Sequence, residues 1–405
     1  MAPGRAGSLE SLRRLNRLRV INALRDVGLI SRAEIARRTG LSRSTVSSLV
    51  AELQADGLVV ERSEEPASAH GDHGGRPPTL LSFDASAGVA IGIDFDHHHL
   101  RVAVSDLSST ILAEREQALD TDHLAHEGLD AATELVAQVL ADAGVERGRV
   151  IGAGMCLPGP IHQPTGVVGS TAILPGWVGV AAADEMRCRL ELPVAVDNDA
   201  NLAALAEAAF GAGRDAKDLV YLMISSGIGA GLVLNGRLYR GSVGLAGELG
   251  HVLVDPGGAV CRCGNRGCLE TVAGTDALAD LLRRSHGEGL DGRRIVELAR
   301  EGDLGTRRVL ADAGRAIGAV AATLVNVLNP ELLIVGGDLA AAGDLLLDGV
   351  RESLGLAALP TAAEAATVVA GSLGDRAEVL GAIALVLSEA EGAFPMRPVA
   401  EAGAR

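Results

Sequence analysis

Aromatic side chains are scarce in this chain of 405 residues: one Trp, two Tyr and four Phe make up 2% of it. Proteins that bind single-stranded nucleic acids stack the bases on aromatic rings, so this ligand class is disfavoured. Lysine is scarcer still, and the only one, Lys217, lies outside any G-x-x-x-x-G-K pattern, which excludes a P-loop nucleotide site. No apolar run approaches the roughly 18 residues of a membrane span, and no secretion signal opens the chain, so we expect a cytoplasmic protein.

Cysteine is also rare, with five residues, and an odd number in a cytosolic chain argues against a disulfide framework. Three of them, Cys261, Cys263 and Cys268, lie within eight positions, and His251 precedes them by ten residues. Three thiolates and one imidazole form a closed tetrahedral set suited to structural Zn²⁺. The alternative is three small buried residues, because free cysteine is often part of a core. The polar, turn-forming CGNRG segment favours the metal site.

The net charge of −16 is unevenly distributed along the chain. Residues 1–82 hold 12 Arg and nine acidic residues, a balance of +3, whereas the rest holds 24 basic and 43 acidic residues, a balance of −19. A basic module on an acidic body can bind phosphates locally, while the acidic bulk disfavours indiscriminate adhesion to nucleic acid.

The basic part has the pattern of a winged helix. Apolar residues at helical spacing predict a helix over 9–27, and Ser31 followed by Glu34 predicts the N-cap of a second helix that ends at Gly40. Ser42 caps a third helix, so the second and third form a helix-turn-helix. Two predicted strands, 58–62 and 79–83, flank a tip that would be the wing.

The exposed start of the third predicted helix carries small hydroxyls and one arginine, which suit the major groove of DNA. The expected DNA-contacting residues are Arg32, Ser42, Arg43, Ser44, Thr45 and Ser47, together with Arg76 at the base of the wing, near the minor groove. A scaffold used only for oligomerisation is the alternative, but a dimer seam would be apolar. One winged helix covers too few base pairs for specific binding, so we expect a homodimer or homotetramer on inverted-repeat operator DNA.

From Gly88 onward, apolar runs of strand length alternate with helical segments, beginning with a β-meander over 89–116. The segments VDNDAN, ISSGIGAGLVLNGRLYRGSVGLAGELGH and CRCGNRGCLE, together with GGRPP in the wing, resemble the ROK family (repressors, open reading frames and kinases) over essentially the whole chain. The resemblance implies an α/β architecture in which a winged helix-turn-helix, 1–84, precedes a two-lobed, actin-like (ribonuclease-H-like) body. The first lobe would span 85–196 and the second 197–374, and a helix at 375–391 would return to the first lobe.

The resemblance also implies that a sugar or sugar phosphate binds in the cleft between the lobes. A ring of hydroxyls needs carboxylates and amides that accept and donate hydrogen bonds in pairs. The implied sugar-binding residues are Gly159, Asn198, Asp199, Glu248, His251 and Glu270, with Trp177 of the LPGW segment as a neighbour. His251 would bind zinc through one ring nitrogen and offer the other to a hydroxyl. Asp199 also fits the role of helix N-cap, and the two roles are compatible. Ile173 departs from the family, since many sugar-binding members carry Asn before LPGW, so the identity of the sugar stays open.

Family kinases need a catalytic Asp and two glycine-rich phosphate loops. Asp199 stands at the position of the base, and the second loop, SSGIGAG, is intact. The first loop reads Asp94-Phe95-Asp96-His97-His98-His99 in place of D-x-G-G-T, where glycines let backbone amides approach the phosphates. Asp96 adds negative charge and His97 and His98 fill space, so ATP should bind poorly.

The three histidines could form a second metal site instead, but adjacent strand residues point to opposite faces, which disfavours one shared ion. We therefore expect a sugar-responsive transcriptional repressor without enzymatic activity. The alternative is an active or bifunctional ATP-dependent sugar kinase.

Overall fold

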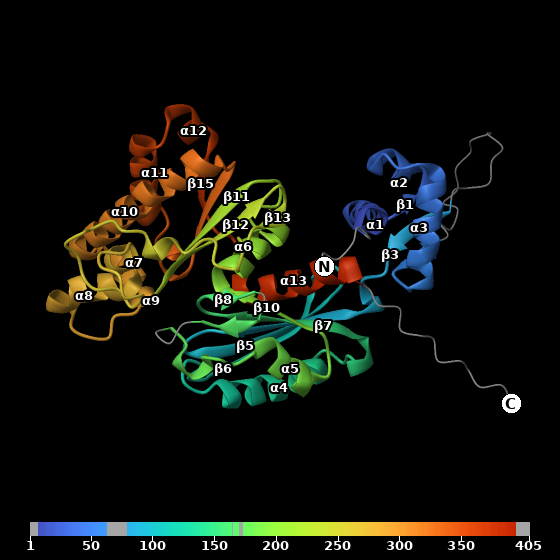
Figure 1. Ribbon diagram of the computed structural model, residues 1–405, viewed down its shortest axis with the longest axis horizontal. Coiled ribbons are helices and arrows are strands. Elements are labelled where there is room, and N and C mark those ends of the chain that lie inside the picture. Colours follow the sequence, from blue (N-terminus) through green and yellow to red (C-terminus); the bar gives the residue numbers. More distant parts are fainter. Residues whose placement is uncertain (1–6, 63–78, 164, 170–172, 394–405) are drawn as a thin grey trace, which may run out of the picture.

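The computed structural model describes residues 7–62, 79–163, 165–169 and 173–393 (Figure 1). The expected fold class is confirmed, with a small three-stranded sheet near the N-terminus and two five-stranded sheets in the body. Helix α13, Ala377–Ala393, lies between the first-lobe sheet and the other two parts of the molecule (Figure 1).

The N-terminal domain has the predicted helix-turn-helix and its strands. Its elements are α1 (Gly7–Val27), β1 (Ile30–Ser31), α2 (Arg32–Thr39), α3 (Arg43–Ala55), β2 (Val59–Arg62) and β3 (Leu80–Phe83), with the strand order β1-β3-β2. The predicted caps are confirmed: Ser31 accepts from the backbone N–H of Glu34, Ser42 accepts from that of Thr45, and Gly40 ends α2 with a φ of 68°. The tip of the wing, with Arg76, lies outside the described residues.

The first lobe is built on a sheet of order β10-β7-β4-β5-β6. The predicted meander is confirmed as β4, β5 and β6, which pair antiparallel, while β7 and β10 are parallel. Alternate residues of β4 face opposite sides: Ile91 and Ile93 pack on α4 and α5, and Ala90 packs on α13. The elements are η1 (Ala85–Ala87), β4 (Val89–Phe95), β5 (His99–Asp106), β6 (Ile111–Ala118), α4 (Ala125–Asp142), η2 (Arg147–Arg149), β7 (Val150–Leu157), β8 (Ile161–His162), β9 (Val167–Val168), η3 (Pro175–Trp177), α5 (Ala182–Leu190) and β10 (Val194–Asn198).

The second lobe has a sheet of order β13-β12-β11-β14-β15. Helix α6 covers one face of it, and α7 to α11 contribute to the large core on the other face. The elements are α6 (Asp199–Phe210), β11 (Leu219–Ile224), β12 (Ile228–Leu234), β13 (Arg237–Leu238), η4 (Leu249–His251), α7 (Glu270–Ala273), α8 (Thr275–His286), α9 (Gly292–Glu301), α10 (Leu304–Leu328), β14 (Leu332–Gly336), η5 (Asp338–Ala342), α11 (Asp344–Ala357), α12 (Pro360–Ala365), β15 (Thr367–Ala370) and η6 (Gly374–Arg376).

Among the described residues, only α10 is long and apolar enough to pass for a membrane span. Half of its most apolar window is buried, and Gly314 and Gly318 bring its backbone against α11. A Cβ on Gly314 would lie 2.3 Å from the carbonyl oxygen of Leu346. The apolar composition of α10 is therefore explained by the core that it shares with α11.

Helix α13 is held by close backbone contacts to the first-lobe sheet and to α6. A Cβ would lie 2.5 Å from the Val379 carbonyl oxygen if added to Gly92, and 2.0 Å from the Ala382 carbonyl oxygen if added to Gly154. In the same way, Gly381 of α13 lies against the backbone of α6. These glycines let two strands and two helices approach more closely than any side chain permits.

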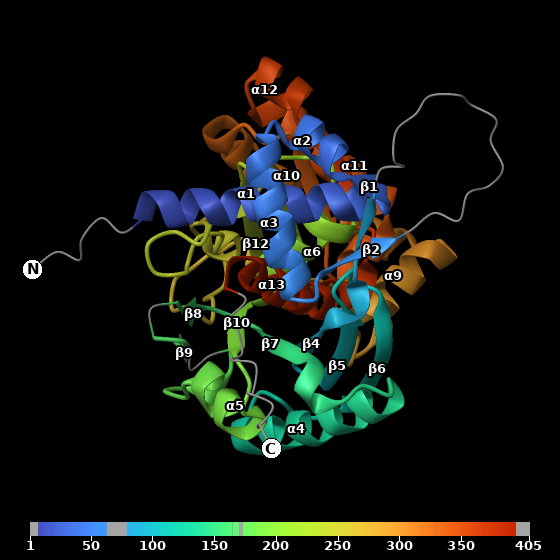
Figure 2. The ribbon, with the colours of Figure 1, turned by 90° about the vertical axis from the view of Figure 1, so that its right-hand side faces the viewer.

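Helix α13 also packs on the winged helix. Ile383 and Leu387 of α13 belong to one hydrophobic cluster with Val20 and Leu24 of α1. In Figure 2, α1 runs horizontally above α13, and the two helices are in contact. A single apolar core therefore joins the N-terminal domain to the body.

Candidate functional site

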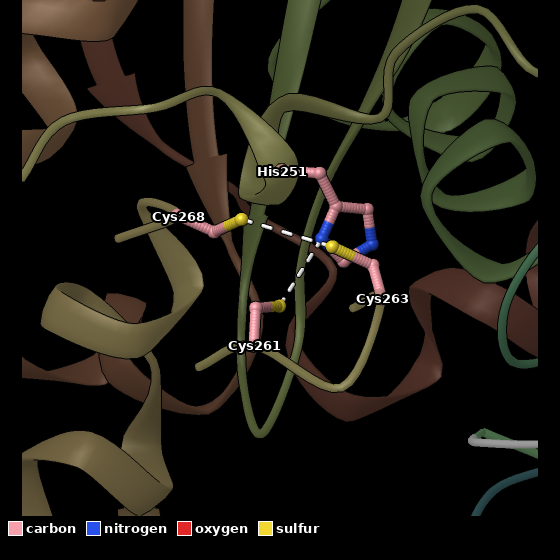
Figure 3. Close-up of side chains that lie close together, drawn as sticks. All are labelled: His251, Cys261, Cys263 and Cys268. Carbon is pink, nitrogen blue, oxygen red and sulfur yellow. Dashed lines mark hydrogen bonds between the residues drawn. The ribbon is translucent and has the colours of Figure 1, made fainter. Parts of the chain in front are cut away.

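His251 and three cysteines converge from separate turns of the second lobe (Figure 3). Their ligand atoms all lie within 4.8 Å of one another. Cys261 Sγ is 3.6 Å from His251 Nδ1, and Cys263 Sγ is 3.7 Å from Cys268 Sγ, too far for a disulfide. The cluster can therefore hold a metal ion.

Tight turns of the chain bring these ligands together. Gly267 has a φ of 70°, and a Cβ there would lie 1.6 Å from the Asp255 carbonyl oxygen, so no other residue fits. Cys268 pairs with Leu253 in an isolated β-bridge, which holds the cysteine loop beside the segment that follows His251.

The structure brings Asn198, Asp199, Glu248, His251 and Glu270 to the junction of the two lobes, and we call these five residues the interlobe cluster. Asn198 ends β10 of the first lobe, and Glu270 begins α7 of the second. His251 turns Nδ1 toward the cysteines, and its Nε2 lies 3.8 Å from a carboxylate oxygen of Glu248. The metal cluster and the interlobe cluster thus share one imidazole.

Asn198, and not Asp199, is the N-cap of α6. Its Oδ1 accepts from the backbone N–H of Asn201 at 2.9 Å, whereas Asp199 is the first helical residue and accepts from the N–H of Ala200. The cap role considered for Asp199 is wrong by one position, because the β conformation needed at a cap falls on Asn198.

The carboxylates of the interlobe cluster affect one another. Burial, aided by the charges of Glu248 and Asp96, raises the pKa of Asp199 to about 6, against the opposing influence of the Ala200 backbone N–H and of His97. Burial and the charge of Glu270 likewise raise the pKa of Glu248. Groups of both lobes are therefore within electrostatic reach of one ligand-sized region.

Asp197 was not singled out from the sequence, although it lies within VDNDAN. It is 1% exposed, and its Oδ1 accepts from the N–H of Asn198 and from the side-chain amide of Asn201, each at 2.9 Å. Its other oxygen accepts from Arg240 of the second lobe. This buried ion pair ties the two lobes together directly beside Asn198 and Asp199.

Arg262 was also missed. It forms a bidentate ion pair with Glu270, Nε to Oε1 at 2.7 Å and Nη2 to Oε2 at 2.8 Å. Its position between Cys261 and Cys263 could have indicated this role, because the metal loop brings the residue at that position close to the interlobe cluster.

Trp177 does not contact the interlobe cluster, so the expectation that it neighbours the sugar is wrong. Its side chain is 0% exposed and lies in the core of the first lobe. Its ring meets Phe95 edge-on with 5.1 Å between centroids, and its indole N–H donates to the Thr121 carbonyl oxygen at 2.7 Å. Burial of this large surface in an apolar core outweighs any contact at the lobe junction.

Gly159 lies in the loop after β7 with a φ of 85°. A Cβ there would lie 2.9 Å from Cγ2 of Ile173, the position at which the sequence departs from the family. Gly159 and Ile173 therefore form one packing unit of the first lobe.

The loop between β4 and β5 is closed by its own side chains. Asp96 accepts from the backbone N–H of His98 at 3.1 Å and pairs with His99 at 3.3 Å, and His97 pairs with Asp122 at 2.7 Å. The His98 amide, which would face a phosphate in a glycine loop, is thus occupied by a carboxylate. The ring centroids of His97 and His98 are 6.4 Å apart, and among the described residues the His251 cluster is the only group of candidate metal ligands.

The intact second glycine loop also has a packing role. A Cβ on Gly231 would lie 2.2 Å from the Ala200 carbonyl oxygen, and one on Gly229 would lie 3.2 Å from Cβ of Ala200. These glycines let α6 rest on β12, so their presence does not require a bound nucleotide.

On the winged helix, the exposed face of α3 begins at Arg43, whose guanidinium has no partner among the described residues. Ser42 is committed to its cap and contacts the hydroxyls of Ser44 and Thr45 at 2.9 and 2.8 Å, while Ser47 is exposed. These positions are those of a helix that enters a groove by its N-terminal turn.

Arg32 is held inside the domain. It donates to Gln54 at 3.2 Å and to Glu61 at 3.1 Å. Its side chain is nevertheless 35% exposed, so the expected contact with DNA stays a prediction.

Comparison with known proteins agrees with both parts of the structure. The ROK family profile matches residues 90–389, and the MarR family profile matches residues 14–67. The chain is 31% identical to the xylose repressor of Caldicellulosiruptor bescii over 95% of this chain and 98% of that protein. It is 29% identical to the DNA-binding transcriptional dual regulator NagC of Escherichia coli K12, over 95% and 96% of the two chains.

Among solved structures, a ROK family transcriptional regulator homologous to the E. coli MLC protein aligns with a TM-score of 0.81 and 26% identity, over 94% of this chain and 97% of that one. A ROK family glucokinase from Streptomyces griseus, in complex with glucose and AMPPNP, aligns with a TM-score of 0.65 and 31% identity, over 74% and 99%. The regulator matches the winged helix and the body, whereas the kinase covers a share of the chain that corresponds to the body alone. The chain therefore belongs to the ROK family, and a MarR-type winged helix precedes its ROK body.

Proposed function

We propose that the chain is a sugar-responsive transcriptional repressor in which a sugar bound at the interlobe cluster changes the DNA affinity of the winged helix. The observation that carries this proposal is the single apolar core that joins α1 of the winged helix to α13 of the body. A tethered DNA-binding domain could move freely, but a packed one must respond to any displacement of α13. Relatives that match 95% of the chain are named xylose repressor and N-acetylglucosamine repressor, which agrees with this proposal.

The coupling runs from the interlobe cluster through α6 and α13. Asp199 begins α6, α6 contacts α13 at Gly381, and Ile383 contacts the winged helix. Arg25 of α1 adds a polar link, since it donates to the Leu107 carbonyl oxygen of the first lobe at 2.7 Å. A small shift of α6 on ligand binding is thereby passed to the DNA-binding domain.

Zinc is the metal that best fits the cysteine cluster. Tetrahedral zinc with Zn–S bonds of about 2.3 Å and a Zn–N bond of about 2.0 Å places two sulfurs about 3.8 Å apart and sulfur and nitrogen about 3.5 Å apart. The separations of 3.7 Å and 3.6 Å agree with these values. With three thiolates and an imidazole the ion would have no open position, so it would fix the loop that carries His251 and supply no chemistry.

The proposed sugar-binding residues are Gly159 and the interlobe cluster, in which Asp199 keeps the position of a kinase base. We propose that it does not act as one, because the first phosphate loop is occupied by Asp96 and the three histidines. Burial raises the pKa of Asp96, but its hydrogen bonds to His99 and His98 more than offset this, so its pKa stays below the usual value. A charged carboxylate at this place opposes a triphosphate.

The DNA-bound form is proposed to be a homodimer or homotetramer on an inverted-repeat operator, because one α3 helix spans only a few base pairs. The proposed DNA contacts are Ser42, Arg43, Ser44, Thr45 and Ser47, with Arg76 of the wing. The proposed domains are 1–84, 85–196 with the returning helix 375–391, and 197–374, and the proposed location is the cytoplasm.

The deciding experiment is a mobility-shift titration on the operator with and without sugars, run on the wild type and on Asp199→Asn. The expected result is a sugar that changes operator affinity in the wild type and has no effect on Asp199→Asn, while that variant still binds the operator. Equal operator affinity with and without a sugar that occupies the interlobe cluster would sink the proposal, since binding at two coupled sites must be reciprocal.

A sugar kinase is the second candidate function, because Asp199 and the second glycine loop are both present and the S. griseus glucokinase aligns with the body. An ATP-dependent phosphorylation assay on hexoses separates the two. Turnover in the usual enzyme range of about 1–10³ per second would favour the kinase.

A further inference from the structure

Hydrogen bonds from Arg262 use much of the accepting capacity of the Glu270 carboxylate. A carboxylate offers about four lone-pair sites. Arg262 fills one on each oxygen, and the backbone N–H of Ile228 donates to Oε2 at 3.3 Å. Sγ of Cys261 also lies 3.8 Å from Oε1. The Glu270 side chain is only 10% exposed, so water has little access to it.

The neighbouring loop is shaped to hold this guanidinium. A Cβ on Gly227, in the second glycine loop, would lie 2.8 Å from Nη2 of Arg262. Glu270, the carboxylate with which this guanidinium pairs, belongs to the interlobe cluster. Arg262 therefore lies within the proposed sugar site, although it belongs to the metal loop.

We propose that Arg262 determines sugar specificity by competing with the sugar for Glu270, an inference that rests on the proposed function. A hydroxyl can donate to Glu270 only if it displaces one of the two hydrogen bonds from Arg262. A sugar with an oxygen placed to accept from the displaced guanidinium recovers that loss, and a sugar without one does not. The pair thus selects among uncharged sugars by the arrangement of their oxygens.

The test is calorimetric titration of the zinc-loaded, full-length protein with D-xylose, D-glucose and N-acetyl-D-glucosamine. Arg262→Ala frees Glu270, so each sugar that the wild type binds should bind about ten- to a hundredfold more tightly, the worth of one charged hydrogen bond. The differences in affinity among the three sugars should shrink, because the displaced group that distinguished them is gone. Arg262→Lys, which keeps the charge without the fork, should lie between.

Arg266→Ala is the matched control. Arg266 lies on the same loop between the cysteines, but it donates to the Gly258 carbonyl oxygen at 2.7 Å and has no contact with Glu270 among the described residues. It should leave all three affinities unchanged. Zinc content and melting temperature are measured for each variant, and Arg262→Gln replaces Arg262→Ala if the latter loses zinc.

The outcomes separate this inference from the proposed function. In one outcome the wild type binds a sugar and Glu248→Gln does not, which supports the proposed sugar site. If Arg262→Ala then binds that sugar with unchanged or weaker affinity and unchanged selectivity, only the role of Arg262 is overturned. Binding by Arg262→Ala but not by the wild type supports complete competition. If neither protein binds any of the three sugars, both this inference and the proposed sugar site at the interlobe cluster are overturned.

Discussion

Asp94, near the end of β4, is a buried acid that costs stability when it is charged. It is 3% exposed, and burial, aided by the charge of Asp96, raises its pKa to about 7, against the opposing influence of His99, Cys156 and Arg101. The folded state therefore holds this proton more tightly than the unfolded chain, whose Asp has a pKa of about 3.9. Folding stability must fall as the pH rises from about 4 through about 7.

Asp94→Asn removes this dependence. At pH 8 the variant should be more stable than the wild type, by on the order of 2–4 kcal/mol, and at pH 4 the two should be nearly equal. Thermal unfolding followed at several pH values measures the difference. Asp280→Asn, at a side chain that is 65% exposed, is the control and should show no such trend. A constant difference between Asp94→Asn and the wild type from pH 4 to pH 8 would contradict the assignment.

A second prediction at the scale of single residues concerns the cysteines of the metal cluster. Cys268→Ser should lower the zinc content from about one per chain and should weaken the sugar response together with it, because His251 serves both clusters. Cys188→Ser is the matched control, since Cys188 is exposed on α5, in the other lobe. Metal analysis and operator titration on the same preparations give the two readouts. Normal sugar response in a zinc-free Cys268→Ser protein would show that the metal does not position His251.

At the scale of elements, local signals in the sequence were sufficient for the helices and strands with caps or clear periodicity. Ser31, Gly40 and Ser42 fixed the helix-turn-helix because capping depends on residues three positions apart. The strand β1 was missed because two residues, Ile30–Ser31, carry no periodicity.

The contacts between elements were not predictable in this way. Trp177 was assigned to the sugar site by resemblance, but its partners Phe95 and Thr121 are distant in sequence, and only packing shows that it is enclosed. The resemblance gave the residues of the interlobe cluster, and the structure brings them together. It did not give Arg262 or Arg240, because each acts through a partner that depends on the fold.

The position of α13 makes a prediction about coupling. Gly381→Ala would place a Cβ 2.0 Å from the Leu202 carbonyl oxygen, so α13 must shift relative to α6. We expect the factor by which sugar changes operator affinity to move toward one, with a loss of stability of about 1–3 kcal/mol from overpacking. Mobility-shift titrations with and without sugar, well below the melting temperature, measure that factor.

Gly355→Ala is the control for this substitution. It lies in α11 with nothing within 4 Å of the added Cβ, so the coupling factor should be unchanged. An unchanged factor in Gly381→Ala as well would mean that the signal does not pass between α6 and α13.

At the scale of the whole molecule, the distribution of charge matches the proposed division of labour. The first 82 residues carry +3 and the remainder −19, so only one end of an acidic protein attracts phosphates. The body contributes the apolar surface that holds the winged helix in place. Binding to DNA should therefore be salt-dependent through the N-terminal domain and sugar-dependent through the body.

Arg43 allows the contribution of the DNA contact to be separated from that of the sugar. It is the first residue of α3, and its exposed guanidinium is free to reach a base edge or a phosphate. Arg43→Ala should weaken operator binding by about 1–3 kcal/mol if the contact is a bidentate one to a base, with a loss of preference at that base pair. A phosphate contact would instead weaken binding to all sequences and lower the salt slope by about one. Either way the sugar-coupling factor should be unchanged, because Arg43 lies outside the core shared with α13.

Arg37→Ala, at an exposed arginine paired with Glu34, is the control. Mobility shifts at two salt concentrations, with operator and with scrambled DNA, distinguish these outcomes. Unaltered affinity of Arg43→Ala for both DNAs would remove Arg43 from the interface.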